Sequence, residues 1–179
     1  MIRTERLLLR QFSPDDWRDL HEYLSQPKTV QYEPYDVFSI EQAKQEAARR
    51  CADESFWAVV LPSGKVIGNV WLAKGGFDTW QLGYVFNCDY WGHGYATEAC
   101  RAALDDVFAN HSAHRITATV NPANEPSWRL LERLGFRREG HLLKNVFFRT
   151  DAEGQPVWQD TYEYALLASE WYGSGMPRR

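Results

Sequence analysis

The most constraining stretch of the sequence runs from Tyr90 to Ala99 and places two glycines and an alanine between a strand-like run, Leu82 to Phe86, and an amphipathic helical pattern. The first backbone N–H groups of a helix have no partner within the helix, and the helix dipole adds partial positive charge at that end. Residues without bulky side chains let an anion approach the backbone closely. This arrangement predicts a phosphate-binding turn, although an ordinary strand-to-helix turn fits the same residues.

Charge and cysteine content narrow the function classes. A net charge of −4 argues against nucleic acid as the main partner, because binding to a phosphate backbone needs clustered Lys and Arg in excess. The three cysteines have no CxxC or Cys/His ligand spacing, which predicts reduced thiols, a cytoplasmic protein and no metal. No apolar run reaches the roughly 18 residues of a membrane helix, so no membrane partner is expected.

The chain is long enough for one full domain, and its hydrophobic periodicity predicts a mixed α+β architecture. We expect this domain to cover residues 1–172, with a loose tail at 173–179, in a monomer or a homodimer. Capping signals at Ser13 and Ser39 begin two helices, and Gly135 ends another. Strands are expected at residues 7–12, 56–61, 66–73, 80–86, 115–120, from 136 and at 161–167, and helices at 13–25, 39–53, 96–110 and 127–134.

This order of elements, together with three short motifs, resembles the GCN5-related N-acetyltransferase (GNAT) superfamily. The motifs are Tyr90–Ala99, Asn124-Glu125-Pro126-Ser127 and Leu134-Gly135-Phe136, and the resemblance extends from Thr4-Glu5-Arg6-Leu7 to Glu170-Trp171. Trp91 stands where the superfamily usually has Gln or Arg, and in this the chain is similar to the branch of the ribosomal-protein alanine N-acetyltransferases. The resemblance implies a single GNAT-type domain with a mixed central sheet of about six to seven strands flanked by four helices.

The resemblance also implies acetyl-coenzyme A (acetyl-CoA) as the co-substrate. The glycine turn would then hold the pyrophosphate, and a strand expected to splay from its neighbour would pair its main chain with the amide-rich pantetheine arm. Asn124 would contact the same arm, although a simple helix cap is an alternative for this residue. The expected acetyl-CoA-binding residues are Val85, Phe86, Trp91, Gly92, His93, Gly94, Tyr95, Ala96, Thr97 and Asn124.

Acetyl transfer to an amine requires a neutral nitrogen, a polarised thioester carbonyl and a proton for the departing thiolate. Many members of the superfamily supply that proton from a Tyr seven residues after the helix Asn, but Leu131 stands there in this chain. Ser127 lies one turn earlier on the same helical face, and in the resembling branch a Ser at this position is the proposed acid. We therefore predict Ser127 as the acid, with Asn124 beside it in the catalytic set; a Ser that bonds to the helix backbone is the alternative.

The general base is not identified by the sequence. The resembling branch can carry a Glu in the strand after the last helix, but the matching position is Val146. Glu33, Asp160 and Glu163 are candidates by general position, and each can equally be a structural acid. An α-amino group with a pKa near about 8 is partly neutral at cytoplasmic pH, whereas a Lys amine near about 10.4 is almost fully protonated. We therefore hypothesise an acceptor amine of modest pKa.

Three residues of an aromatic loop, Tyr32, Glu33 and Tyr35, are expected to contact the acceptor, because the loop forms one wall of the acceptor pocket in the resembling proteins. Core packing is the alternative for the aromatic residues of this loop, Tyr32, Tyr35 and Phe38. His93, His141 and Cys88 are assigned no catalytic role. The predicted activity is direct, acetyl-CoA-dependent acetylation of a protein N-terminal α-amine or a small-molecule amine in a ternary complex. A catalytically idle acyl-CoA-binding module and a structural protein that does not bind coenzyme A are the competing interpretations.

Overall fold

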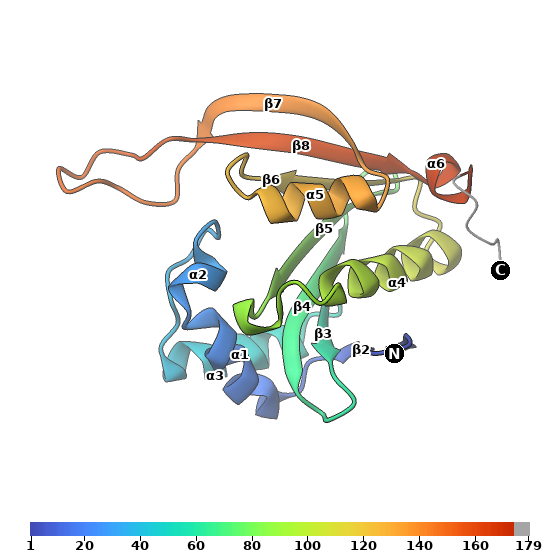
Figure 1. The fold of residues 1–179 in the computed structure, drawn as a ribbon, viewed down its shortest axis with the longest axis horizontal. Coiled ribbons are helices and arrows are strands. Elements are labelled where there is room, and N and C mark those ends of the chain that lie inside the picture. Colours follow the sequence, from blue (N-terminus) through green and yellow to red (C-terminus); the bar gives the residue numbers. More distant parts are fainter. Residues whose placement is uncertain (174–179) are drawn as a thin grey trace.

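A computed structural model describes residues 1–173 of the chain (Figure 1). Eight strands form one mixed sheet in the order β1-β2-β3-β4-β5-β6-β8-β7. The strands are β1 (Ile2–Arg3), β2 (Leu8–Gln11), β3 (Phe56–Val60), β4 (Val66–Lys74), β5 (Thr79–Phe86), β6 (Arg115–Val120), β7 (Arg137–Val146) and β8 (Gln159–Leu167). The α-helices of this part are α1 (Trp17–Leu24), α2 (Pro27–Val30), α3 (Ile40–Cys51), α4 (Tyr95–Asn110), α5 (Glu125–Arg133) and α6 (Ala168–Gly173).

The predicted class, a mixed α+β domain, is confirmed, but the predicted number of elements is too small. The two-residue strand β1 pairs with β2, and two residues are too few to show a hydrophobic period. The four-residue helix α2 and the short helix α6 escaped prediction for the same reason. Gly173, placed in a loose tail by the sequence, is the last residue of α6, and residues 174–179 lie outside the described part of the chain.

Helix starts follow their local signals. The Ser39 hydroxyl accepts from the Gln42 N–H, and the Gln42 side chain accepts from the Ser39 N–H, so α3 begins with the predicted capping box. Ser13 and Asp16 form the same reciprocal pair, but it caps a single 3₁₀ turn, Pro14–Asp16, before α1 begins. The helix predicted over residues 13–25 is therefore a 3₁₀ turn followed by an α-helix.

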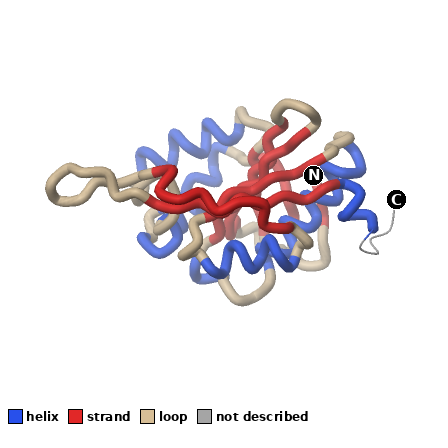
Figure 2. The backbone as a smooth tube through the Cα atoms, turned by 90° about the horizontal axis from the view of Figure 1, so that it is seen from above, coloured by secondary structure: helices blue, strands red, loops and turns tan. Residues whose placement is uncertain are grey.

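Helices cover both faces of the sheet (Figure 2). Side chains alternate between the faces along a strand, so Val59 joins a cluster with Leu104 of α4, whereas Ala58 packs in a second cluster with Leu20 of α1 and Ala47 of α3. The strand β5 runs parallel to β6, and a parallel neighbour needs a crossover connection, which α4 provides.

The strands β5 and β6 are paired only at one end. Their register joins Thr79–Gln81 to Arg115–Thr117 and then stops, whereas β5 stays paired with β4 as far as Phe86. The second half of β5 therefore has one open edge in the middle of the sheet. This is the splay that the family resemblance implied for the strand before the glycine turn.

Candidate active site

A cavity of about 1110 Å³ opens where β5 and β6 separate. The glycine turn lies at one end, β5 and the first turns of α5 form the walls, and the loop between α2 and α3 closes the other end. Pockets for a single small ligand range up to about 1,000 Å³. The volume lies at the upper end of this range, so the cavity can take a large ligand.

The glycine turn leaves the start of α4 open. Gly92 and Gly94 have φ angles of +81° and +79°, a left-handed conformation that side chains other than Gly rarely adopt. Gly94 is the N-cap residue of α4 and has no side chain to cap the helix. Tyr95, Ala96 and Thr97 follow it along the cavity wall, so the first N–H groups of α4 can take an anion from the cavity.

Trp91 and His93 lie differently from each other within the turn. Trp91 lines the cavity, and its indole Nε1 donates to the Phe86 carbonyl at 2.8 Å, so the turn is tied back to the end of β5. The His93 ring stacks on the Tyr95 ring, and its Nδ1 lies 3.0 Å from the Trp91 carbonyl oxygen. His93 is outside the lining of the cavity, so its ring contacts the turn itself and not the space for a ligand.

The main chain of β5 presents alternate residues to the open edge. The Asn87 N–H donates to the Ile67 carbonyl of β4 at 2.9 Å, so Val85, two residues earlier, also directs its main chain to β4. Tyr84 and Phe86 therefore direct theirs to the gap. Of the two residues named from the sequence, Phe86 offers its N–H to a ligand, while Val85 offers its side chain.

Ser127 lies in the first turn of α5, which begins at Glu125, two residues before the predicted start. Its hydroxyl lies 2.9 Å from the Tyr84 hydroxyl, and the Tyr84 hydroxyl also donates to the Ser127 carbonyl at 3.0 Å. Burial raises the pKa of Tyr84 and keeps it a neutral phenol. Asn124 is the N-cap residue of α5, makes no side-chain cap bond and lines the cavity, so its amide can meet a ligand.

Tyr84 is a site residue that the sequence did not identify. The alternation of β5 places it on one face with Leu82 and Phe86, but nothing in the sequence shows that α5 packs opposite this face. The contact between Tyr84 and Ser127 joins positions 43 residues apart. Only the tertiary fold brings them together.

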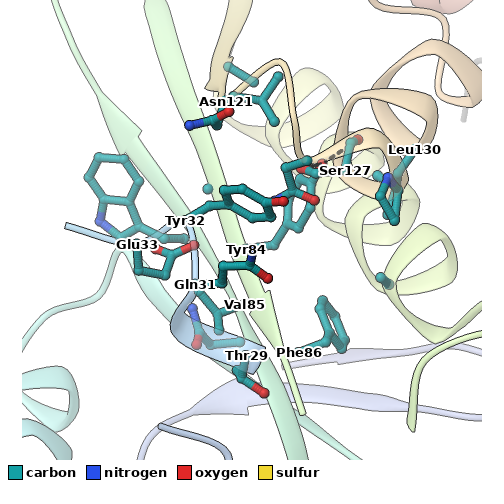
Figure 3. A pocket seen from close by; sticks show the side chains of 18 of the residues that line it. Thr29, Gln31, Tyr32, Glu33, Tyr84, Val85, Phe86, Asn121, Ser127 and Leu130 are labelled. Carbon is teal, nitrogen blue, oxygen red and sulfur yellow. Dashed lines mark hydrogen bonds between the residues drawn. The ribbon is translucent and has the colours of Figure 1, made fainter. Parts of the chain in front are cut away.

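The aromatic loop closes the other end of the cavity. The Tyr32 hydroxyl donates to the Ala123 carbonyl at 3.2 Å and so bridges this loop to the loop before α5. Tyr35 packs edge-on against Phe38, with ring centroids 5.3 Å apart. Figure 3 shows Glu33 on one side of the cavity and Ser127 on the other.

Glu33 differs from the other two candidate bases. Burial raises the pKa of Glu33 to about 7, although the Tyr35 hydroxyl and the charge of Arg50 act in the opposite direction. The Lys144 N–H and the His141 ring bind Asp160 and lower its pKa. Glu163, on β8, is exposed and outside the lining of the cavity. Glu33 is therefore the candidate that combines a place in the cavity with a pKa near neutrality.

A buried polar cluster supports this end of the cavity. The Arg50 side chain is 3% exposed, and it donates from Nη1 to Asn69 at 2.8 Å and from Nε to Glu46 at 2.7 Å. The Tyr23 hydroxyl donates to the same Asn69 oxygen at 3.1 Å. The sequence held one signal: Ala43, Ala47 and Arg50 share a helical spacing, which places Arg50 on the buried face of α3.

The described residues offer neither a metal cluster nor a membrane-spanning helix. Within residues 1–173, no three His, Cys, Asp or Glu side chains gather as a possible metal site. In the same part of the chain, every helix is too short or too polar to cross a bilayer. Cys51, Cys88 and Cys100 are free thiols.

Comparison with known proteins places these features in a family context. The model of the Acetyltransferase (GNAT) domain matches residues 6–137. The N-acetyltransferase YnaD of Bacillus subtilis is 38% identical over 173 residues, which cover 95% of this chain and 98% of that protein. The [Ribosomal protein uS5]-alanine N-acetyltransferase of Escherichia coli is 33% identical over 100 residues, which cover 56% of this chain and 48% of that protein.

Two solved structures share the fold. An acetyltransferase of the GNAT family from Bacillus anthracis has a TM-score of 0.86 and 36% identity, and the match covers 94% of this chain and 99% of that chain. A spermidine N-acetyltransferase from Vibrio cholerae, solved in complex with CoA and spermine, has a TM-score of 0.78 and 22% identity, with coverage of 94% and 99%. At that lower identity the likeness is one of fold alone.

Proposed function

Since the chain belongs to the GNAT family of acetyltransferases and is an N-acetyltransferase, we propose that it transfers acetyl from acetyl-CoA directly to a primary amine, in a ternary complex. The acceptor is a protein N-terminal α-amine or a small-molecule amine of modest pKa. The observation that carries this proposal is one continuous cavity between β5 and β6, which joins an open helix N-terminus to Ser127 and Glu33. The relatives include a ribosomal-protein alanine N-acetyltransferase, from the branch that the sequence resembles.

The residues of the cavity fit acetyl-CoA, which supplies the activated acetyl group. The open start of α4 offers backbone N–H groups and partial positive charge to the pyrophosphate. The Phe86 N–H and the Asn124 amide can pair with the amide-rich arm. A ligand bound in this way extends from the glycine turn along β5 toward Ser127.

In the proposed mechanism Ser127 donates a proton to the departing thiolate, and Tyr84 positions it. A serine hydroxyl is a weak acid, so its proton transfer depends on stabilisation of the charge that develops on its oxygen. The Tyr84 phenol, 2.9 Å away, can turn its proton from the Ser127 carbonyl to that oxygen. It thereby leaves the Ser127 proton free to point at the cavity.

Glu33 is proposed as the base that accepts the proton of the acceptor amine. A carboxylate with a pKa of about 7 is about half ionised at neutral pH. Proton transfer to it from an α-ammonium group with a pKa near about 8 costs about 1.4 kcal/mol, whereas transfer from a Lys ammonium costs more than about 4 kcal/mol. This difference favours acceptors with a modest pKa.

A panel of short N-terminal peptides, free amines and amine antibiotics, with acetyl-CoA consumption as the readout, tests the proposal. We expect turnover with at least one peptide or free amine. Tight acetyl-CoA binding without turnover on any amine would favour the idle acyl-CoA-binding module. Absence of any rise in melting temperature with acetyl-CoA would favour the structural interpretation, because a ligand at about 100 times its Kd stabilises a protein by about 2.7 kcal/mol.

A further inference from the structure

The segment before β2 reaches across to the first turn of α4. The Arg6 Nε donates to Glu98 Oε2 at 2.7 Å, and the Arg6 backbone N–H donates to Glu98 Oε1 at 3.0 Å. The Thr4 hydroxyl donates to the same Oε1 at 2.6 Å. The Glu98 carboxylate therefore receives three hydrogen bonds from a segment more than 90 positions away in the chain.

The same arginine touches the glycine turn directly. Its Nη1 donates to the His93 carbonyl at 2.9 Å, and its guanidinium lies 4.8 Å from the centre of the Tyr95 ring. Its Nη2 is 3.5 Å from the place that a Cβ on Gly94 would occupy. Arg6 therefore contacts His93 and Tyr95, the residues on either side of Gly94.

Glu98 is an ionised carboxylate close to the proposed phosphate site. Its partial burial works to raise its pKa, but the hydrogen bonds from Thr4 and Arg6 outweigh this effect and lower it. A negative charge in the first turn of a helix suits the helix dipole but repels a bound phosphate. The Arg6 guanidinium, with Nη2 2.6 Å from Glu98 Oε2, neutralises that charge.

We propose that Thr4, Arg6 and Glu98 form a clamp that positions the glycine turn for the phosphates of acetyl-CoA. Arg6 holds the His93 carbonyl away from the cavity, so the N–H groups after Gly94 stay directed into it. It also cancels the repulsion between Glu98 and the ligand. The clamp rests on the proposed function, and its residues position the turn without touching the acetyl group or the acceptor.

The test compares the Kd of CoA with that of pantetheine, which lacks the phosphates, by calorimetry. Arg6→Ala is expected to weaken CoA binding by about tenfold, because the Glu98 carboxylate in the first turn of α4 then has no cation to neutralise its charge. It leaves the Kd of pantetheine and the kcat with saturating acetyl-CoA within about twofold of wild type. Arg3→Ala, which removes the same charge from exposed β1, is the matched control and leaves all three unchanged.

A second substitution separates the clamp from a general loss of structure. Glu98→Gln in the Arg6→Ala background removes the repelling charge, so CoA affinity is expected to recover by several-fold. Unchanged CoA affinity in Arg6→Ala would overturn the clamp, and so would equal losses for CoA and pantetheine. The readout is binding, so the test of the clamp stays valid if wild-type protein binds CoA but acetylates no amine. That result would refute the proposed function and leave the clamp untouched.

Discussion

The substitution Glu33→Gln, which replaces a carboxylate by an amide, should lower the rate of acetylation and raise the free energy of unfolding. Burial raises the pKa of this group from its usual 4.5 to about 7. At 1.36 kcal/mol per pKa unit, an ionised Glu33 costs the native state about 3 kcal/mol at pH 8 and less than about 1 kcal/mol at pH 5. The penalty develops as the pH rises from the unfolded pKa to the folded one. The substitution should therefore raise the free energy of unfolding at pH 8, by up to this amount, and much less at pH 5.

The pH dependence of kcat/KM gives the catalytic half of the same prediction. In wild type the profile should rise with an inflection near pH 7, where Glu33 ionises. In Glu33→Gln, kcat/KM should fall by about 100-fold. The inflection of its pH profile should move up toward the pKa of the amine itself, about 8 for an α-amine.

Glu163→Gln is the matched control, since this exposed carboxylate on β8 lies outside the cavity and should change neither measurement. Urea unfolding at pH 5 and pH 8, together with the rate profile, makes up the assay. An unshifted inflection in Glu33→Gln would refute the base role. A loss of stability at pH 8 would refute the account of its raised pKa.

Three further substitutions test the rest of the site. Ser127→Ala should lower kcat by about 100-fold with an unchanged Kd for CoA, whereas the control Ser63→Ala, in the exposed β3–β4 turn, should leave kcat unaffected. Equal kcat values for the two variants would refute the acid role of Ser127. Tyr84→Phe should lower kcat by about tenfold through loss of the hydrogen bond to Ser127, and this effect should vanish in the Ser127→Ala background, which a double-mutant cycle of kcat measures. Gly94→Ala should cost about 1 kcal/mol in unfolding free energy, because its φ is +79°, and should weaken CoA binding; an unaltered calorimetric Kd would count against the phosphate turn.

The elements with strong local signals could be predicted from the sequence. The capping box at Ser39, the strand before the glycine turn and the helix after it were all identified, since each is determined by neighbours within a few residues. The glycine turn itself was identified because positive φ angles at Gly92 and Gly94 leave few other residues possible.

The relations between distant segments could not be predicted. Tyr84 meets Ser127, and Arg6 meets Glu98, only after the sheet and its crossover have formed. The raised pKa of Glu33 depends on how far the aromatic loop is buried, which no local pattern encodes. The sequence offered Glu33 as one of three candidate bases, and burial distinguishes among them.

The proposed reaction is direct acetylation of an amine of modest pKa. One peptide that carries a free N-terminal α-amine and a single internal Lys tests it most directly, with acetyl-CoA as donor and mass spectrometry to locate the product. At neutral pH the neutral fraction of the α-amine exceeds that of Lys by more than about 100-fold. We predict acetylation almost entirely at the α-amine, and acetylation mainly at Lys would contradict an acceptor of modest pKa.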